Sequence, residues 1–244
     1  MFNFYVNVYT SSMSPTPRTE RPGHRANPAE ARQRRQQALV AVRRQRVLEA
    51  ARAAFLELGM DKASIREIAR RAGYTAGALY SYFPSKEALY GALLAESLGR
   101  LNARVEAARP AGATPRDELL ASARAFFDFY RDHPRDLDLG FYLFQGMQPR
   151  GLTPELDRAL NARLHDALRP LQDALERLGA TPAVALREVT ALFAHIVGLL
   201  LLGHTGRIRM FGQAPAELLE AYLAQLVQRA GAWCHVRGAA HDGP

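Results

Sequence analysis

Apolar residues recur at intervals of three and four along most of the chain after residue 27, which is the spacing of one face of an α-helix. The second half of the first such segment shows the pattern clearly. Its apolar stripe consists of Val47, Ala50, Ala51, Ala54, Phe55 and Leu58. Gly59 follows and favours a helix end there. No segment shows a convincing alternation of apolar and polar residues, so the pattern predicts an all-α protein.

Prolines, glycines and Ser, Thr or Asp caps divide the chain into nine predicted helices. They cover about residues 27–58, 64–71, 75–81, 85–108, 115–132, 135–148, 153–178, 182–204 and 215–236. Residues 1–26 mix Ser, Thr, Pro, Gly and Arg without apolar periodicity, which predicts a disordered basic tail. Within it, Met13 is an alternative start that the sequence leaves open. Residues 237–244 form a second short tail.

Two short helices and the turn between them stand out at about residues 64–83. Ser64-Ile65-Arg66-Glu67 reads as a capping box, in which Ser64 accepts from first-turn amides and Glu67 bonds back to the cap. Gly73 supplies a left-handed residue that ends the first helix, and Thr75 is placed to cap the second. Two helices joined by a brief glycine turn form a helix-turn-helix.

The second helix of such a unit enters the DNA major groove with its N-terminal residues against base edges. Here these residues are Thr75, Ala76, Gly77 and Ala78. They are small, so close approach is expected, with thymine methyl contacts and reading of DNA shape in place of many direct hydrogen bonds. Tyr80, Ser81, Tyr82 and Lys86 flank the helix as phosphate ligands, whereas Leu79 and Phe83 face the core. The alternative is an ordinary pair of amphipathic helices with packing tyrosines.

The charge distribution favours the nucleic-acid interpretation. The chain carries a formal net charge of +8, and residues 1–86 hold thirteen Arg and two Lys against six acids, a net of +9. The other 158 residues carry seventeen basic and eighteen acidic groups, a net of −1. Positive charge gathered at one end suits binding to the phosphates of double-stranded DNA. The arm from Arg18 to Arg46, with nine Arg against two acids, either binds the neighbouring minor groove or phosphates or is a solvated tail.

Residues 46–94 resemble the DNA-binding domain of the TetR (tetracycline repressor)/AcrR family of transcriptional regulators. The matching residues are Ser64, Ile68, Ala69, Ala72, Gly73, Thr75, Gly77, Leu79, Tyr80, Tyr82, Phe83 and Lys86. The resemblance implies phosphate contacts from Ser64, Arg66, Tyr80, Tyr82 and Lys86, and groove contacts near residues 75–78. It also implies a repressor that a ligand releases from a near-palindromic operator. Tyr74 and Ala76 depart from the family pattern, so no base preference is transferred.

The remaining chain is expected to bind an effector and to dimerise, with residues 27–90 as the DNA-binding domain and 91–236 as the second domain. Aromatic residues are dense between positions 126 and 144. The candidate pocket residues are Phe126, Phe127, Tyr130, Phe141, Phe144, His165, Phe193 and His195. They suit a hydrophobic or aromatic effector, although ordinary core packing is the alternative for each. The helices at 182–204 and 215–236 carry more apolar surface than one stripe requires, which predicts a homodimer through them.

Other functions find little support in the composition. The single cysteine, Cys234, closes no intramolecular disulfide, which favours a reducing, cytoplasmic location. The longest apolar stretch, Val189–Gly203, is shorter than the ~20 residues that span a bilayer, and we interpret it as a buried helix. The seven histidines lack metal-ligand spacing and there is no glycine-rich phosphate loop, so we expect no metal, no cofactor and no enzymatic activity. A helical adaptor that binds protein is the alternative function.

Overall fold

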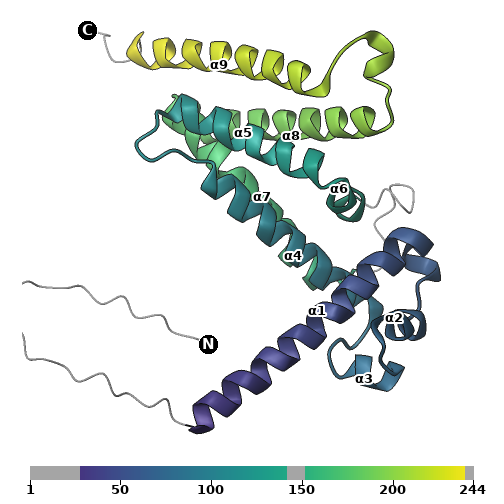
Figure 1. Ribbon diagram of the computed structural model, residues 1–244. Coiled ribbons are helices and arrows are strands. Elements are labelled where there is room, and N and C mark those ends of the chain that lie inside the picture. Colours follow the sequence, from purple (N-terminus) through teal and green to yellow (C-terminus); the bar gives the residue numbers. More distant parts are fainter. Residues whose placement is uncertain (1–27, 142–151, 240–244) are drawn as a thin grey trace, which may run out of the picture. The chain divides into compact units, whose positions relative to one another are not determined.

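The computed structural model describes residues 28–141 and 152–239, with side chains described through Trp233, and this part of the chain is helical without strands (Figure 1). The helices are α1 (Pro28–Lys62), α2 (Ile65–Ala72), α3 (Ala76–Tyr80), α4 (Lys86–Ala107), α5 (Pro115–Asp132), α6 (Pro134–Gly140), α7 (Pro154–Arg177), α8 (Pro182–His204) and α9 (Pro215–Ala239). A 3₁₀ turn, η2 (Arg209–Phe211), precedes α9. The all-α prediction is therefore confirmed.

Side-chain caps place most helix starts where the sequence predicts them. The capping residues whose hydroxyl oxygen accepts a first-turn backbone N–H are Ser64, Thr75, Ser85, Thr114, Thr153 and Thr181. Proline follows three of these threonines and fits the first helical turn, where an N–H has no intrahelical acceptor. Local chemistry is thus sufficient to start these helices.

The predicted break of the first helix at Gly59 is confirmed, since Gly59 is non-helical (φ 75°, ψ 165°), although helical residues resume after this kink and α1 continues to Lys62. Two other predicted helix ends are wrong. The sixth helix ends at Gly140 instead of 148, since Phe141 leaves the helical conformation. The last helix continues to Ala239, beyond the predicted 236.

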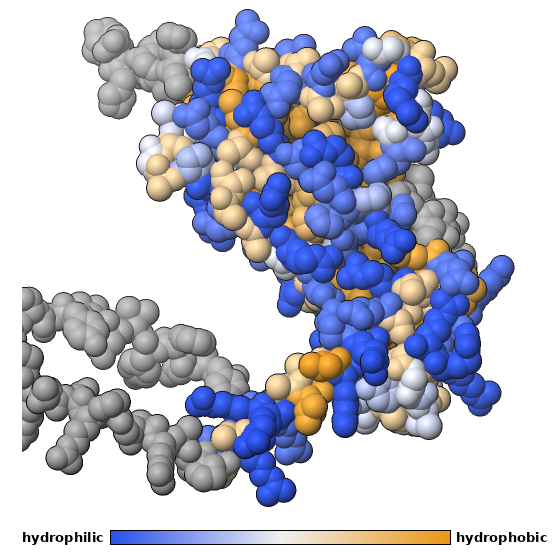
Figure 2. Space-filling model, viewed as in Figure 1, coloured by the Kyte–Doolittle hydropathy of each residue, from blue (hydrophilic) through white to orange (hydrophobic). Residues whose placement is uncertain are grey.

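The first 42 residues and the chain from Arg43 onward form separate units. In the first unit, the described residues belong to α1 and are exposed apart from the half-buried Ala31. The guanidinium of Arg34 lies 4.0 Å from the carboxylate of Glu30. The side chains of Leu39, Val40 and Val42 are exposed to solvent, and orange marks this part of α1 in Figure 2.

The second unit has one hydrophobic core. Its N-terminal part joins Phe55 of α1, Ile68 of α2, Leu79 of α3 and Leu89 of α4, all fully buried. From there α4 continues into the bundle and packs on α5 and α7. Helices α4 and α7 approach closely at Gly91, where an added Cβ would lie 2.3 Å from Leu156.

Helix α8 is more apolar than the stretch Val189–Gly203 alone suggests. It has 23 residues, and an 18-residue window in it reaches a mean hydropathy of 1.8, so by length and composition it is sufficient to cross a membrane. It packs against α5, α7 and α9, as a core helix of a bundle does. Only 33% of the window is buried within one chain, and the other positions are half-buried or exposed.

Candidate nucleic-acid interface

The start of α2 is fixed by Ser64, whose Oγ accepts from the backbone N–H of Glu67 at 3.1 Å. The other half of the predicted capping box differs. The Glu67 carboxylate accepts from Arg70 at 2.8 and 2.9 Å and from Arg71 at 2.7 Å. The hydrogen bonds from these two arginines hold the pKa of Glu67 far below its ordinary value, at about 2. Arg71 also donates to Glu57 of α1 at 2.6 Å, so Arg71 ties α2 to α1, while Glu67 binds the two arginines instead of closing its own cap.

The turn between the two helices is built on Gly73, which has the left-handed conformation (φ 76°, ψ 32°). Its N–H donates to Arg70 O at 3.2 Å, and the N–H of Tyr74 donates to Ala69 O at 2.8 Å. This pair of bonds is a Schellman motif, which satisfies the last carbonyls of α2. Thr75 Oγ1 then accepts from Ala78 N at 3.2 Å and starts α3. The predicted helix-turn-helix is confirmed.

Helix α3 presents a small and open face. Thr75, Gly77 and Tyr80 are exposed, and Tyr80 has 55% of its surface in solvent. No atom lies within 4 Å of a Cβ built on Gly77. Leu79 is fully buried and anchors the helix from below. The face that the sequence assigns to the groove is therefore accessible, with no side chain longer than Thr75 at the start of the helix.

The predicted phosphate ligands are not equivalent in the structure. Arg66 is exposed on α2, whereas Lys86 is half-buried and its Nζ donates to Met60 O at 2.9 Å, which holds the ammonium at the start of α4. Ser81 is exposed, and its Oγ donates to Ala78 O at 2.7 Å. Tyr82 is half-buried against the core, so only part of it remains available.

One arginine of the predicted basic arm contacts a core residue of the DNA-binding region. The guanidinium of Arg44 lies 4.8 Å from the centre of the Phe83 ring, a cation–π geometry. Phe83 itself is buried, as expected. Arg44, which the sequence places in the arm, thus packs on a core residue, and its spacing in the sequence carries no signal of that contact.

A cavity of about 90 Å³ lies between α4, α5 and α7. Of the eight predicted pocket residues, Tyr130 and Phe141 line it. Sequence reasoning missed the wall residues Leu94, Ser97 and Leu98 on α4 and Asp157, Leu160, Asn161 and Leu164 on α7. The α7 residues recur at positions three and four apart and share one helix face, a signal that was available in the sequence.

Several other pocket candidates lie outside this cavity. Phe126 packs behind it, with its ring 5.3 Å from Tyr130 and 5.9 Å from Phe193. Phe127 lines a second apolar cavity of about 260 Å³ beside Leu199, Leu200 and Pro215.

The two predicted pocket histidines do not line the 90 Å³ cavity, and one aromatic candidate cannot be placed. His165 is exposed on α7, so its placement in a pocket is wrong. His195 stacks on Tyr222 at 4.3 Å, where burial lowers its pKa despite a hydrogen bond with the Leu218 backbone. Phe144 lies outside the described residues.

Comparison with known proteins agrees with this geometry. Residues 47–93 match the model of bacterial regulatory proteins of the tetR family. The HTH-type transcriptional repressor KstR of Mycobacterium tuberculosis is 38% identical over 73 residues, covering 30% of this chain and 33% of that protein. The HTH-type transcriptional regulator BetI of Stenotrophomonas maltophilia is 28% identical over 163 residues, covering 64% and 83%. The chain spans about a third of the length of the first curated relatives that it matches.

Solved structures share the fold across most of the chain. A TetR-like transcriptional regulator from Rhodococcus sp. RHA1 aligns with a TM-score of 0.60 at 23% identity, covering 77% of this chain and 97% of that one. The transcriptional regulator FadR from Bacillus subtilis, solved in complex with stearoyl-CoA, aligns with a TM-score of 0.58 at 20% identity, covering 75% and 97%. Residues 47–93, with their helix-turn-helix, thus match the N-terminal domain of the tetR family of bacterial regulatory proteins, and most of the chain shares the fold of these solved structures.

Proposed function

We propose that this protein is a cytoplasmic, sequence-specific transcriptional regulator, most simply a repressor that a small hydrophobic or aromatic effector releases from a near-palindromic operator. Residues 27–90 serve as the DNA-binding domain and residues 91–236 as the effector-binding and dimerisation domain. The observation that carries the proposal is the open face of α3, which is held from below by Leu79 and bears only small side chains at its start.

The interaction with DNA divides into two kinds of contact. Thr75, Ala76, Gly77 and Ala78 approach base edges, and the Thr75 hydroxyl, whose oxygen already accepts from Ala78, keeps its hydrogen for a base acceptor. Ser64, Arg66, Tyr80, Ser81, Tyr82 and Lys86 contact phosphate or sugar. With so few polar groups at the groove, specificity rests mainly on half-site spacing and DNA shape.

Substitution of Arg66 tests the phosphate role. Arg66→Gln is expected to weaken binding to all duplexes by a similar factor and to lower the slope of log affinity against log salt by about 0.9, the value for one lost phosphate contact. Thr75→Ala, in contrast, should change the preferred sequence with little change in the slope. Both are measured by fluorescence anisotropy on an operator selected from random-sequence DNA. A helical adaptor would show neither a salt-dependent nor a sequence-dependent affinity for duplex DNA.

The effector site proposed here is the cavity between α4, α5 and α7. Its walls combine Tyr130 and Phe141 with aliphatic residues and a few polar groups, which is typical of small-molecule sites. The cavity volume is about 90 Å³. Ordinary ligand pockets begin at roughly 300 Å³. An effector of usual size must therefore enlarge the cavity by displacing its walls, and such a displacement is a natural source of a regulatory signal.

The homodimer is proposed to form through α8 and α9, since much of the apolar surface of α8 stays uncovered in one chain. The exposed positions of α8 are mostly apolar and include Ala183, Leu186, Ala191, Ala194 and Leu202, with Arg187 and Thr190 between them. Small residues on this face allow a partner helix to approach closely. A two-fold pair of α8 and α9 helices would bury this surface and set the two α3 helices about 34–36 Å apart, one turn of DNA.

A charge in the middle of this face is expected to separate the two subunits. Ala194→Glu places a carboxylate at an exposed position, so a single chain tolerates it, but the dimer would have to bury it without a partner. Sedimentation velocity should show a monomer where the unchanged protein is a dimer. Ala162→Glu on the exposed side of α7 is the matched control and should stay dimeric. A dimeric Ala194→Glu variant would contradict this interface.

A further inference from the structure

A buried ion cluster links the DNA-binding helices to the short helix α6. Asp136, in the first turn of α6, is only 4% exposed. Its Oδ1 accepts from Arg52 Nη1 of α1 at 2.8 Å and from Arg100 Nη2 of α4 at 2.7 Å. We refer to these three residues as the Asp136 junction. Glu96 of α4 lies beside them, 3.8 Å from Arg52 and 3.5 Å from Arg100.

The junction holds Asp136 in its charged form. Burial acts to raise the pKa of Asp136, but the hydrogen bond from Arg52, the charge of Arg100 and a hydrogen bond from Ser97 outweigh it and lower the pKa below its ordinary value. A buried carboxylate favours the arrangement in which its guanidinium partners stay in place, because separation from them would leave a charge without compensation. The cluster therefore favours one relative position of α1, α4 and α6.

The other end of α6 forms part of the cavity wall. Gly140 and Phe141 line the cavity together with Tyr130 of α5 and Ser97 of α4. Ser97 therefore contributes to the cavity wall as well as to the surroundings of Asp136. The charge of Asp136 also contributes, after burial, to the raised pKa of the Tyr130 hydroxyl. Asp136 and Gly140 themselves lie about one helical turn apart on α6.

A second contact in the same region joins α6 to the core of the helix-turn-helix. The hydroxyl of Tyr90 on α4 donates to Leu139 O, next to the cavity-lining Gly140. The Tyr90 ring packs edge-on against Phe55 of α1 at 5.7 Å. A movement of the cavity end of α6 would therefore act on α1 and α4 through two sets of contacts, those of Asp136 and that of Leu139 with Tyr90.

We propose that Asp136 is a positioning residue that couples occupancy of the cavity to the geometry of the DNA-binding helices through Arg52. Enlarging the cavity displaces Gly140 and Phe141, and α6, a helix of seven residues, moves as a unit and shifts Asp136 against Arg52 and Arg100. Because paired and separated arrangements of a buried ion cluster differ sharply in energy, the response is a switch between two states. This inference rests on the proposed effector cavity and operator binding.

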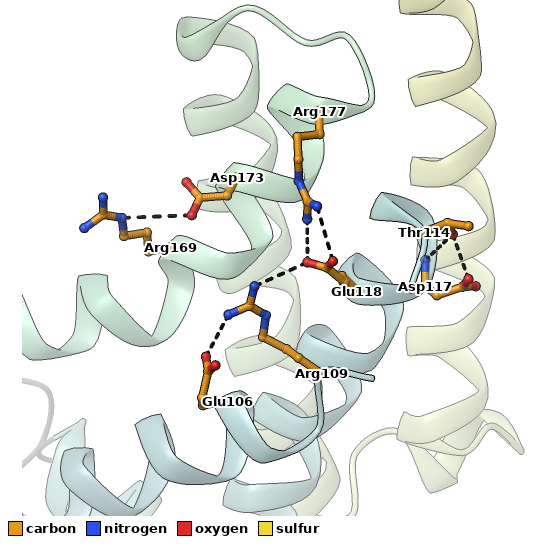
Figure 3. A network of polar contacts seen from close by, with 8 residues as sticks. All are labelled: Glu106, Arg109, Thr114, Asp117, Glu118, Arg169, Asp173 and Arg177. Carbon is orange, nitrogen blue, oxygen red and sulfur yellow. Dashed lines mark hydrogen bonds and ion pairs between the residues drawn. The ribbon is translucent and has the colours of Figure 1, made fainter. Parts of the chain in front are cut away.

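A comparable cluster elsewhere in the bundle provides the control. Glu118 of α5 is also nearly buried and accepts from Arg177 of α7 and Arg109, which in turn pairs with Glu106 (Figure 3). These residues join α5 to α7 and to the end of α4, and none of them lines the 90 Å³ cavity or belongs to α1, α2 or α3. Glu118→Gln removes a buried carboxylate of the same kind without touching the connection to the DNA-binding helices.

A double-mutant cycle tests the coupling without a known effector. Leu164→Phe enlarges a side chain of the cavity wall and serves as a permanent occupant. In the full-length protein it should lower affinity for the selected operator at least about fivefold, the lower end of usual allosteric coupling. In a protein that already carries Asp136→Asn or Arg52→Gln, Leu164→Phe should leave operator affinity nearly unchanged, since the transmitting contact is absent. In a protein that carries Glu118→Gln, Leu164→Phe should still lower operator affinity by the full factor.

The operator affinities of these variants distinguish failure of the junction from failure of the cavity or of the proposed function. If Leu164→Phe lowers affinity equally with and without Asp136→Asn and Arg52→Gln, the junction is merely structural and the inference is overturned. If Leu164→Phe has no effect in the unchanged protein, the cavity does not control DNA binding and the inference fails, although operator recognition stands. If no operator can be selected, the proposed function itself fails. Arg52→Gln keeps the Arg100 pair with Asp136, so it still tests the coupling if the Asp136→Asn variant does not fold.

Discussion

Replacement of Gly77 by Glu is expected to abolish operator binding while the protein remains folded. Gly77 is exposed in α3 and a Cβ there meets no atom within 4 Å, so the fold accommodates a longer side chain. Glycine also stabilises helices less than other residues, so stability should stay constant or rise by up to roughly 1 kcal/mol. In the groove, however, the new carboxylate would occupy the space of close approach and face phosphates of the same charge.

The expected loss is at least about 100-fold in operator affinity, equivalent to roughly 2.8 kcal/mol. Fluorescence anisotropy measures the affinity and thermal unfolding followed by circular dichroism measures the fold. Gly99→Glu is the matched control, because Gly99 is an exposed glycine of α4 with equally open surroundings. It should bind the operator normally apart from a small effect of net charge. Normal operator binding by Gly77→Glu would mean that α3 does not enter the groove.

Phe126→Ala is expected to lower the free energy of unfolding by about 3–5 kcal/mol, the usual cost of deleting a buried phenyl ring. Phe126 is fully buried, and its ring contacts Tyr130 and Phe193 edge-on behind the cavity wall. Removing it leaves a void next to the proposed effector site that neighbouring helices fill only in part. Urea unfolding should show a lower midpoint with an unchanged slope.

Phe211→Ala serves as the comparison for that variant. Phe211 is the same residue type but is 73% exposed in the turn before α9. Removal of its ring should therefore change the free energy of unfolding by less than about 0.5 kcal/mol, as is usual for surface substitutions. Equal effects of the two substitutions would show that Phe126 is not part of the core.

The helix-turn-helix could be predicted because its determinants are local. Ser64 and Thr75 cap helices through atoms three residues away, and Gly73 ends a helix by its own backbone conformation. Glu67 shows where local reasoning stops. A capping box assigns its carboxylate to the cap, but Arg71 competes for it and is itself held by Glu57 of α1, a partner that no local pattern reveals.

The bundle was predicted less completely because its contacts join distant parts of the chain. Aromatic density identified Tyr130 and Phe141, yet the cavity is completed by Ser97 and Asp157, which sit in ordinary amphipathic stretches. His165 shows the same limit, since residue type alone does not determine which face of α7 turns inward. The Asp136 junction depends on pairs 84 and 36 residues apart and leaves no pattern in the sequence.

The central claim, sequence-specific DNA recognition through α3, is tested most directly by one measurement. The affinity of the full chain for a selected operator is compared with that for a shuffled duplex of equal length and composition, over a range of salt concentrations. A regulator of this kind should prefer the operator by about 10³-fold or more, with affinity for both duplexes falling steeply as salt rises. Equal affinity for the two duplexes, or no duplex binding at low salt, would contradict it.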